Sequence, residues 1–600
     1  MTTAGGVNAA AVGAVIGTEF DQKISATQEE QFILTSDAYD PTINQQPLEV
    51  YLYWSKIERE HEANDTRAIA DSPWLRTFKK ATGQAHKINW HEPHNDQMVI
   101  SDSPTDSNEK DGTDVGQSST QPLTDKERTY RALRVASWQA VFYLITTDIL
   151  GFSSAPEAFA ELGVGPGILV YVFFYLLAVF AGQVIWRLYC DYDSAKYPVT
   201  CYADLGERTF GRWVRHVFNA FQSAQLLFNV ALLIIGNGQT LVSIIGFKFC
   251  YLALNIFFML VGITGGQIRS LRNFSWFANI NIWLNIIVMI ITVAGIWSYL
   301  PVPSQSYHVN LSQPIQIAYW VPGYTKGWYA QVSGVQLAVF AYGGAMIFPE
   351  FMAEMRRPRD FWKSALCAQF FCFFMYMLFG LVCYLKQGQY SSILPGLDFQ
   401  NNQLILANNI IGLISTMVAA VLYGNIGVKV FYENVLRAYF KAPSMMTSNK
   451  GRLLWSISVT AYWVIAWVIG SAIPNLTALI TLVGSAFILQ FTYTFPPVLL
   501  LGYWMQRDAM KADSEWRPGM APGSTRIDTW KDLSRWKRGF KKYWYIKLFL
   551  FLMHLAAWAN CGLGIYAGIE TAISAYKCGY NIPFSCYAPN DPAVQKTNCS

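Results

Sequence analysis

The sequence predicts an all-α integral membrane protein of about eleven transmembrane helices, and two observations carry that prediction. The first is composition: of 600 residues, 52% are hydrophobic and only 14% are charged, whereas a soluble protein carries roughly a quarter charged residues. The second is clustering. Runs such as 167–186 and 366–385 are apolar on every face and have the length of about 20 residues that crosses ~30 Å of hydrocarbon. A soluble core could bury one such helix, but not a long series of them.

Apolar segments of spanning length follow one another from residue 136 onward. They are expected at 136–163, 165–187, 213–244, 249–267, 274–299, 329–354, 362–385, 403–437, 452–473, 476–504 and 543–575. The preceding segment, 1–125, has no such run and is rich in Asp, Glu, Ser, Gln and Asn, so we expect a largely disordered tail. Within it, 48–62 has the pattern of a short helix, either a docking element or, by the preferred interpretation, a marginal one. The membrane domain is therefore placed at 126–577 and a second tail at 578–600.

Lys and Arg gather in alternate loops, which predicts the orientation of the chain by the positive-inside rule. Basic clusters precede the first span and recur near 187–215, 269–272, 356–363, 437–452 and 505–542. The N-terminus and these loops are thus expected in the cytoplasm, and the C-terminus outside. The expected location is the plasma membrane, with the vacuolar membrane as the alternative.

Two features of the outer side follow from this orientation. Asn310 begins an Asn-Leu-Ser sequence in the long outer loop and is a candidate glycosylation acceptor. Cys578, Cys586 and Cys599 lie in the outer tail, where a disulfide can persist. The remaining cysteines are scattered, with no Cys/His spacing typical of a metal site, so we expect no metal and no cofactor.

Two spans are interrupted at mid-membrane. The first contains Gly151 and Pro156, and the sixth contains Gly343 and Gly344 followed by Pro349. A lone glycine in a membrane helix usually serves close packing. Here two interrupted spans are each followed by four continuous ones, which is the pattern of inverted repeats with discontinuous helices at their interface.

An unwound segment suits a zwitterionic solute. Backbone N–H and C=O groups without partners cost several kcal/mol each in hydrocarbon unless they face a ligand or a water-filled cavity. A carboxylate can accept from amides freed at a half-helix N-terminus, and an ammonium can donate to carbonyls freed at a half-helix C-terminus. The breaks therefore predict a binding site for an amino acid.

The residues at the breaks also carry a family resemblance. The sequences at the two breaks resemble motifs of the amino acid/auxin permease family: GFSSAPEAFAELG (151–163) and FAYGGAMIFPEFMAEMRRPRDF (340–361). The sequence ITTDILG (145–151) resembles its fungal neutral amino-acid permeases in particular. The resemblance covers about 126–577. It implies two inverted repeats, about 136–299 and 329–504, with an eleventh helix at 543–575. It also implies amino-acid uptake driven by a co-transported cation, usually a proton in fungi, with sodium as the alternative.

The candidate substrate-binding residues lie at the two breaks. They are Thr147, Asp148, Gly151, Phe152, Ser153, Phe340, Tyr342, Gly343 and Gly344. Phe152, Phe340 and Tyr342 favour a neutral, fairly large substrate side chain, because an acidic or basic one would require a buried counter-charge.

Acidic residues inside spans are candidates for proton coupling, because an acid at mid-membrane costs at least ~2.5–3.5 kcal/mol. Asp148 is the principal candidate, as a proton acceptor or as a counter-charge to the substrate ammonium; the alternative is a neutral carboxyl bonded to a neighbour. Glu350 is a second candidate. Glu354 is expected to pair with Arg356 or Arg357 as a gate or anchor, and for both glutamates a structural ion pair is equally compatible.

Two other features suggest partners. Ser415 and Thr416 resemble hydroxyls that complete a cation site in sodium-coupled relatives of this fold, although such hydroxyls more often bond their own backbone. The 529–544 segment alternates aromatic residues with Lys and Arg and is expected to lie on anionic lipid headgroups. A role in nucleic-acid binding would need a soluble basic domain, which the sequence lacks.

Other functional classes fit less well. A channel is expected to have rings of like residues, which the sequence does not show. A membrane enzyme is expected to have clustered His and Asp residues, whereas the seven histidines are dispersed. We therefore expect a transporter and not an enzyme. A non-transporting amino-acid sensor of the same fold stays open as an alternative.

Overall fold

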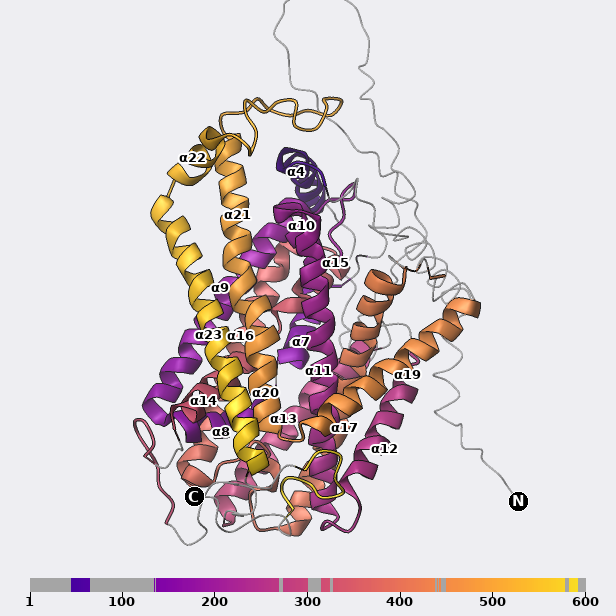
Figure 1. The fold of residues 1–600 in the computed structure, drawn as a ribbon, viewed down its shortest axis with the longest axis vertical. Coiled ribbons are helices and arrows are strands. Elements are labelled where there is room, and N and C mark those ends of the chain that lie inside the picture. Colours follow the sequence, from indigo (N-terminus) through magenta and orange to yellow (C-terminus); the bar gives the residue numbers. More distant parts are fainter. Residues whose placement is uncertain are drawn as a thin grey trace, which may run out of the picture.

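The structure is a computed structural model that describes residues 45–64, 134, 136–149, 151–268, 274–300, 314–323, 327–437, 440, 442–443, 449–577 and 582–591. The elements in this part of the chain are helices, without a named strand (Figure 1). Nine of its helices are long and apolar enough to cross a membrane, and the shorter α12 and the broken pair α7–α8 take the places of the fourth and first spans. The predicted all-α integral membrane fold is confirmed.

The spans agree with the expected bounds to within a few residues. The first is α7 (Trp138–Ile149), η1 (Phe152–Ser154) and α8 (Ala155–Leu162), and the sixth is α14 (Trp328–Ala341), η4 (Ala345–Ile347) and α15 (Phe348–Glu354). The continuous spans are α9 (Val164–Tyr192), α11 (Arg212–Ile244), α12 (Tyr251–Gly265), α13 (Phe274–Ser298), α16 (Phe361–Gln387), α17 (Asn402–Phe431), α19 (Asn449–Ala472) and α23 (Trp544–Lys577). The tenth is α20 (Leu476–Val483) with α21 (Phe495–Met510), and the two are joined by the π-helical segments η9 (Gly484–Ile488) and η10 (Gln490–Thr494).

Both predicted breaks are present, and proline marks the restart of each helix. Pro156 and Pro349 stand in the first turn of α8 and α15, where a missing N–H leaves no hydrogen bond unmade and the fixed φ suits a helix start. Short 3₁₀ turns, η1 and η4, connect the half-helices. The two broken spans are also joined to each other: Ala136 N donates to Glu354 O (2.9 Å), and Arg356 N donates to Ala136 O (3.0 Å).

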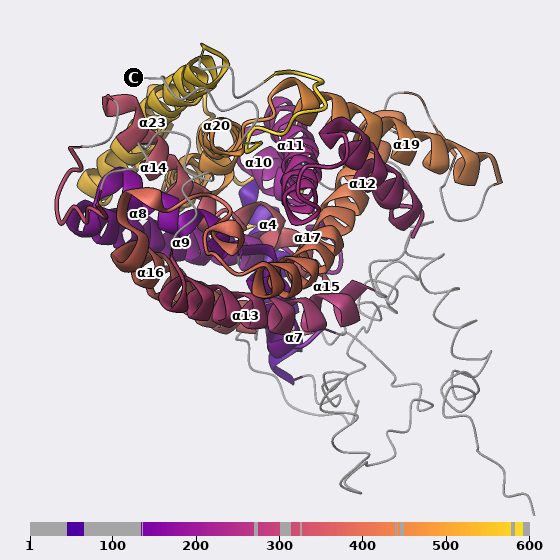
Figure 2. The ribbon, with the colours of Figure 1, turned by 90° about the horizontal axis from the view of Figure 1, so that it is seen from below.

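The spans form an elongated bundle. Seen along the helices, α8, α9, α14 and α23 lie toward one side of the cross-section and α12, α17 and α19 toward the other, with α11 and α20 between them (Figure 2). One end of the bundle carries three short helices, α4 (Leu48–Asn64), α10 (Tyr202–Phe210) and α22 (Leu533–Lys541), and we call it the α4 end (Figure 1).

The opposite end carries the C-terminal segment 582–591. Cys586 forms a disulfide with Cys250, which directly precedes α12, and we call this the disulfide end. The expectation of a disulfide in the outer tail is thus met for Cys586, although Cys250 was counted among the scattered cysteines. Cys578, Cys599 and Asn310 lie outside the described residues.

The short helix expected at 48–62 is docked, not marginal. Five of its buried positions, Leu48, Tyr51, Ser55, Glu58 and Glu62, recur every three or four residues and form one face, and the helix packs on α9. The ring of Tyr51 meets those of Tyr192 and Tyr197 edge-on, at centroid distances of 5.8 and 5.6 Å. On the other flank, Arg526 forms a two-pronged ion pair with Glu49, at 3.0 and 3.1 Å.

A buried carboxylate holds α4 to the membrane domain. Asp193, at the end of α9, is fully buried and accepts from Arg134 (2.8 Å), from Arg59 of α4 (3.0 Å) and from Val199 N (3.1 Å). Arg59 in turn pairs with Glu62 one helical turn further on, at 2.8 Å. Three separate segments share this one carboxylate. Its removal would leave the guanidinium groups of Arg134 and Arg59 with less negative charge to balance them.

We predict that Asp193→Ala lowers the free energy of unfolding by about 3–5 kcal/mol, because breaking a buried ion pair from one side leaves the other charge uncompensated. The measurement is thermal denaturation of the purified protein in detergent. Asp360→Asn is the matched control, because the Asp360–Lys363 pair is partly exposed and such pairs contribute about 0–1 kcal/mol. Equal effects of the two substitutions would contradict the assignment of Asp193.

Candidate functional site

A cavity of about 290 Å³ lies where the two broken spans meet the continuous ones. Its walls come from both helix breaks, from α11, α13, α17 and the tenth span, and from the segment that joins α16 to α17. The lining residues are Thr147, Gly151, Phe152, Ser153, Ser154, Gln225, Asn229, Leu232, Leu233, Gly236, Asn237, Thr240, Asn281, Asn285, Val288, Thr292, Phe340, Gly343, Met346, Ile393, Leu394, Pro395, Gly396, Asn408, Asn409, Gly412, Leu413, Ser415, Thr416, Ala419, Tyr423, Leu476, Ile480 and Ile488. Among these described residues there is no Asp, Glu, Lys, Arg or His.

Most of the residues expected to bind substrate line this cavity. Thr147, Gly151, Phe152, Ser153, Phe340 and Gly343 are in its wall. Gly344 and Tyr342 are not among the lining residues. Tyr342 is buried instead among the rings of Tyr171 and Tyr376. Asp148 lies in α7, one residue after Thr147, and the description of the structure does not extend to its side chain.

The first break is held open by a residue that sequence reasoning missed. Tyr376 of α16 accepts a hydrogen bond from Gly151 N to its hydroxyl oxygen, at 2.8 Å. This bond supplies a partner for an amide that the unwinding of the span would leave without one. At the sixth-span break the corresponding amides bond locally: Gly343 N donates to Phe340 O (3.2 Å) and Gly344 N to Tyr342 O (3.0 Å). Part of the backbone cost of each break is therefore met by the protein itself.

The two glycines at the breaks have different surroundings. A Cβ at Gly343 would lie 2.6 Å from Ile488 Cγ2, within the π-helical part of the tenth span, so this glycine is required by packing. A Cβ at Gly151 would meet only the Tyr376 hydroxyl, at 3.7 Å, which is an ordinary contact. Gly151 instead exposes its backbone to the cavity.

The wall opposite the breaks is rich in side-chain amides and hydroxyls. The hydroxyl of Ser415 of α17 lies within hydrogen-bond distance of the side-chain carbonyl oxygens of Asn281 (2.6 Å) and Asn285 (2.7 Å) of α13, and its one proton is shared between them. Thr416 donates to Asn237 of α11, and Asn408 donates to Thr292 (3.0 Å). All four asparagines line the cavity while they bond hydroxyls of neighbouring spans.

Several buried polar atoms of this wall have no hydrogen-bond partner within the described part of the chain. They are Gln225 Oε1, Asn229 Oδ1, Asn237 Nδ2 and Asn408 Oδ1. Each residue is at most 8% exposed. Because an unmade hydrogen bond in a buried site costs about 1–3 kcal/mol, these atoms are available to bond a polar ligand or water.

The hydroxyls considered for a cation site are engaged in this wall. Ser415 bonds two asparagines, and Thr416 bonds Gly412 O (2.9 Å) of its own helix as well as Asn237. Thr416 thus bonds the backbone of its own helix, whereas Ser415 bonds side chains of another span. The described residues contain no group of His, Cys, Asp and Glu that could hold a metal ion.

A cap covers the cavity toward the disulfide end. Ile393, Leu394, Pro395 and Gly396 form its inner surface, and Gly396 O accepts from Asn409 Nδ2 of α17 at 2.8 Å. Its shape is maintained by Asp398, which is fully buried and accepts from Ser392 N (3.1 Å) and Ser392 Oγ (2.7 Å). Burial raises the pKa of Asp398 to about 7, against the lowering effect of the two bonds from Ser392.

The comparisons with known proteins agree with this architecture. Residues 134–517 match the family described as transmembrane amino acid transporter protein. The chain belongs to this family. It is also 24% identical to the N amino acid transport system protein of Neurospora crassa, over 74% of this chain and 87% of that protein. A transmembrane transporter of Gibberella moniliformis is 24% identical over 62% of this chain and 76% of its own length. The chain is thus an integral membrane transporter, not an enzyme.

The transporter places its other membrane acids away from the cavity lining. Glu350 of α15 accepts from Gln222 of α11 at 2.9 Å, toward the α4 end. Glu157 of α8 accepts from Thr477 of α20 at 2.8 Å, and so connects the first span to the tenth. Glu354 is exposed at the end of α15, close in sequence to the buried Arg356.

The contrast between the two glycines predicts two kinds of defect in the transporter. Gly343→Ala should lower uptake by at least roughly 10-fold and reduce thermal stability, because the added methyl displaces Ile488. Gly151→Ala should keep the thermal stability and raise the KM for uptake, because its methyl occupies space in the cavity. A second variant, Gly343→Ala/Ile488→Leu, removes the methyl branch in conflict and should recover stability. Similar melting temperatures for the two single variants would contradict this division.

Asp398 predicts a pH dependence of stability. Its pKa in the folded protein, about 7, lies above the ordinary value of 3.8, so the folded state holds the proton more tightly than the unfolded one. The contribution is therefore most favourable below about pH 4 and declines as pH rises toward 7. Thermal denaturation between pH 5 and 8 should show a smaller decline in Asp398→Asn than in the wild type, whereas Asp360→Asn should keep the wild-type slope. An unchanged slope in Asp398→Asn would refute the assignment.

Proposed function

We propose that this transporter imports neutral amino acids together with a cation, most simply a proton, by alternating access. The observation that carries the proposal is the cavity in which both helix breaks meet and whose described lining has no charged side chain. The relatives support amino acids as the solute class, since the Neurospora crassa protein is named as an amino acid transport system.

The breaks supply the poles that an amino acid backbone needs. Gly151, Ser153 and Gly343 present backbone and hydroxyl groups to the cavity, and α8 and α15 begin at the breaks with the positive ends of their dipoles. The Asn-rich wall offers unpartnered carbonyl oxygens, such as Asn229 Oδ1, to an ammonium or a polar side chain. Since the described lining residues offer no counter-charge, an acidic or basic substrate side chain would be desolvated without compensation from them.

Proton coupling is proposed because of the position of one acid. The hydroxyls of Ser415 and Thr416, the candidate sodium ligands, donate to asparagine carbonyls and to their own helix, which leaves their oxygen lone pairs for the sodium-coupled alternative. Asp148 follows the cavity residue Thr147 directly in α7, so it stays the principal candidate for the coupling acid. Glu350 is the second candidate, and its bond to Gln222 connects the sixth span to α11.

The two ends of the bundle support an orientation. The basic 505–542 segment and α4 lie at the α4 end, which we assign to the cytoplasm, and the disulfide lies at the opposite end, which we assign to the outside. The plasma membrane is the proposed location. The main-chain bonds of Ala136 to Glu354 and Arg356 would then join the cytoplasmic ends of both broken spans, as part of an inner gate.

The decisive experiment is uptake of labelled neutral, acidic and basic amino acids into vesicles that contain the purified protein. The pH and sodium gradients are varied independently. We expect concentrative uptake of neutral amino acids that follows the pH gradient and is unaffected by sodium. Dependence on sodium alone would select the sodium-coupled alternative, and substrate binding without uptake would select the sensor.

Asp148→Asn tests the coupling step. The amide mimics the protonated acid, so the variant should bind substrate and exchange it across the membrane but should lose accumulation driven by a pH gradient. Glu350→Gln is the comparison variant, because it also removes one carboxylate, in this case one that lies toward the α4 end. If Asp148→Asn loses binding altogether, the carboxylate holds the substrate ammonium instead. If pH-driven accumulation persists in Asp148→Asn and fails in Glu350→Gln, Glu350 is the coupling residue.

A further inference from the structure

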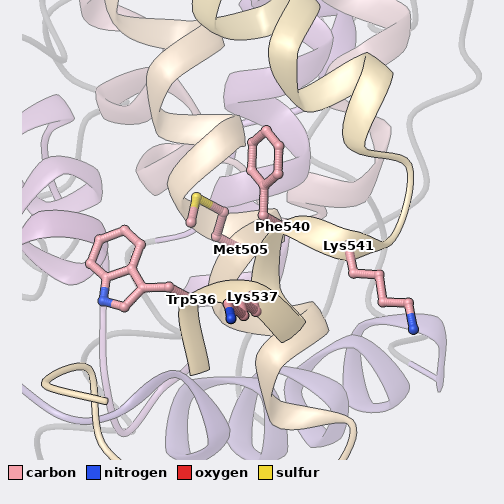
Figure 3. A pocket seen from close by; sticks show the side chains of 5 residues that line it. All are labelled: Met505, Trp536, Lys537, Phe540 and Lys541. Carbon is pink, nitrogen blue, oxygen red and sulfur yellow. The ribbon is translucent and has the colours of Figure 1, made fainter. Parts of the chain in front are cut away.

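A second cavity lies at the α4 end, outside the proposed transport path. Its volume is about 490 Å³, and it is lined by Met505 of α21 and by Trp536, Lys537, Phe540 and Lys541 of α22. Figure 3 shows Met505 and Phe540 next to each other, with Trp536 and Lys541 on opposite sides of them. The cavity thus combines an apolar surface with two ammonium groups four residues apart on one helix.

The helix α22 is attached to α21 and α23 by buried contacts, which position the backbone that carries the lining of this open cavity. Arg535, 1% exposed, bonds Asp513 (2.9 Å) and Asp528 (3.2 Å). Gly539 presses against α21 so closely that a Cβ would lie 2.7 Å from Met505 O. The fully buried Lys547 of α23 donates to Gly539 O and to Asp508.

The charges of this region are unevenly matched. Arg535, Arg538 and Lys547, which fix α22, each pair with an aspartate. Lys537 and Lys541 form no ion pair with an acid among the residues that the structure describes. A basic pair beside an apolar surface is complementary to a molecule that has both an anionic group and a hydrocarbon part.

Neighbouring residues place the cavity at the level of lipid headgroups. Trp544 and Tyr545 begin the membrane span α23 and are 55% and 57% exposed, as in the aromatic belts of membrane interfaces. Trp536 is 48% exposed, and its indole N–H donates to Trp530 O at 2.8 Å, which fixes the ring at the edge of the cavity. Phe540 is 37% exposed beside it.

We propose that this cavity is a binding site for one anionic glycerophospholipid, with the phosphate at Lys537 and Lys541 and an acyl chain against Met505, Trp536 and Phe540. The site is independent of which solute the transporter carries. It differs from general attraction to the bilayer because it predicts a lipid in contact with one tryptophan and dependence on two particular lysines.

The test uses the full chain in lipid nanodiscs of phosphatidylcholine with increasing phosphatidylserine, brominated on its acyl chains to quench tryptophan. Because the protein has 21 tryptophans, the signal of Trp536 is taken as the difference between the wild type and Trp536→Phe. Brominated phosphatidylcholine serves as the neutral-lipid comparison. We expect quenching by the anionic lipid at a low mole fraction, and weaker quenching by the neutral one.

The lysines are tested with a matched pair of double variants. Lys537→Gln/Lys541→Gln should raise the mole fraction for half-maximal quenching by roughly 10-fold or more, since each basic residue near an anionic surface contributes about 1 kcal/mol. Lys531→Gln/Arg517→Gln removes the same charge from exposed positions outside the cavity and should change it by less than about 2-fold, the loss of general attraction only.

Three outcomes would overturn the proposal. Equal quenching by the two lipids would make the contact a general one with the bilayer. Equal effects of the two double variants would show that net charge alone matters. Relief of quenching by millimolar inorganic phosphate would identify the site as one for a free anion. Melting temperatures of all variants are compared with that of the wild type, to confirm that α22 stays in place.

Discussion

The structure depends on one constraint: a backbone that unwinds inside a membrane must find partners for its N–H and C=O groups. The first span meets it with a tyrosine from α16, whose hydroxyl accepts from Gly151 N, and the sixth with bonds inside its own turn. Prolines then restart both helices without creating a further unpaired amide. The protein itself thus provides partners for part of each break, and a bound solute has to satisfy only the groups that remain.

On the opposite wall of the cavity, buried polar side chains also need hydrogen-bond partners. Serine and threonine hydroxyls of α17 are paired with asparagine carbonyls of α11 and α13, so three spans are joined by neutral hydrogen bonds. Buried charges here would have cost far more to desolvate. Charged pairs are instead concentrated at the α4 end, where Asp193 joins α4, α9 and Arg134.

Much of this architecture could be predicted from the sequence, because a bilayer imposes length and polarity on each span locally. Nearby residues alone were enough to place the span bounds, the two breaks and, of the nine residues predicted to bind substrate, the six that line the cavity. Tyr376 could not be predicted, since it meets Gly151 across 225 positions of sequence. The docking of α4 was underestimated for a related reason: its buried face contains glutamates, and their partners Ala195 and Arg526 come from the segments that follow α9 and α21. A local sequence pattern does not reveal contacts between residues that are far apart in the chain.

The disulfide between Cys250 and Cys586 has a consequence for how the protein is made. The bond closes a ring of chain that contains every span from α12 to α23, with 336 positions between its two ends. A ribosome must therefore complete the last helix, and the bilayer must accept it in the correct direction, before the two sulfurs share one compartment. The disulfide can therefore form only after the last helix has been inserted. A chain whose insertion stops before α23 would keep the thiols of Cys250 and Cys586 reduced.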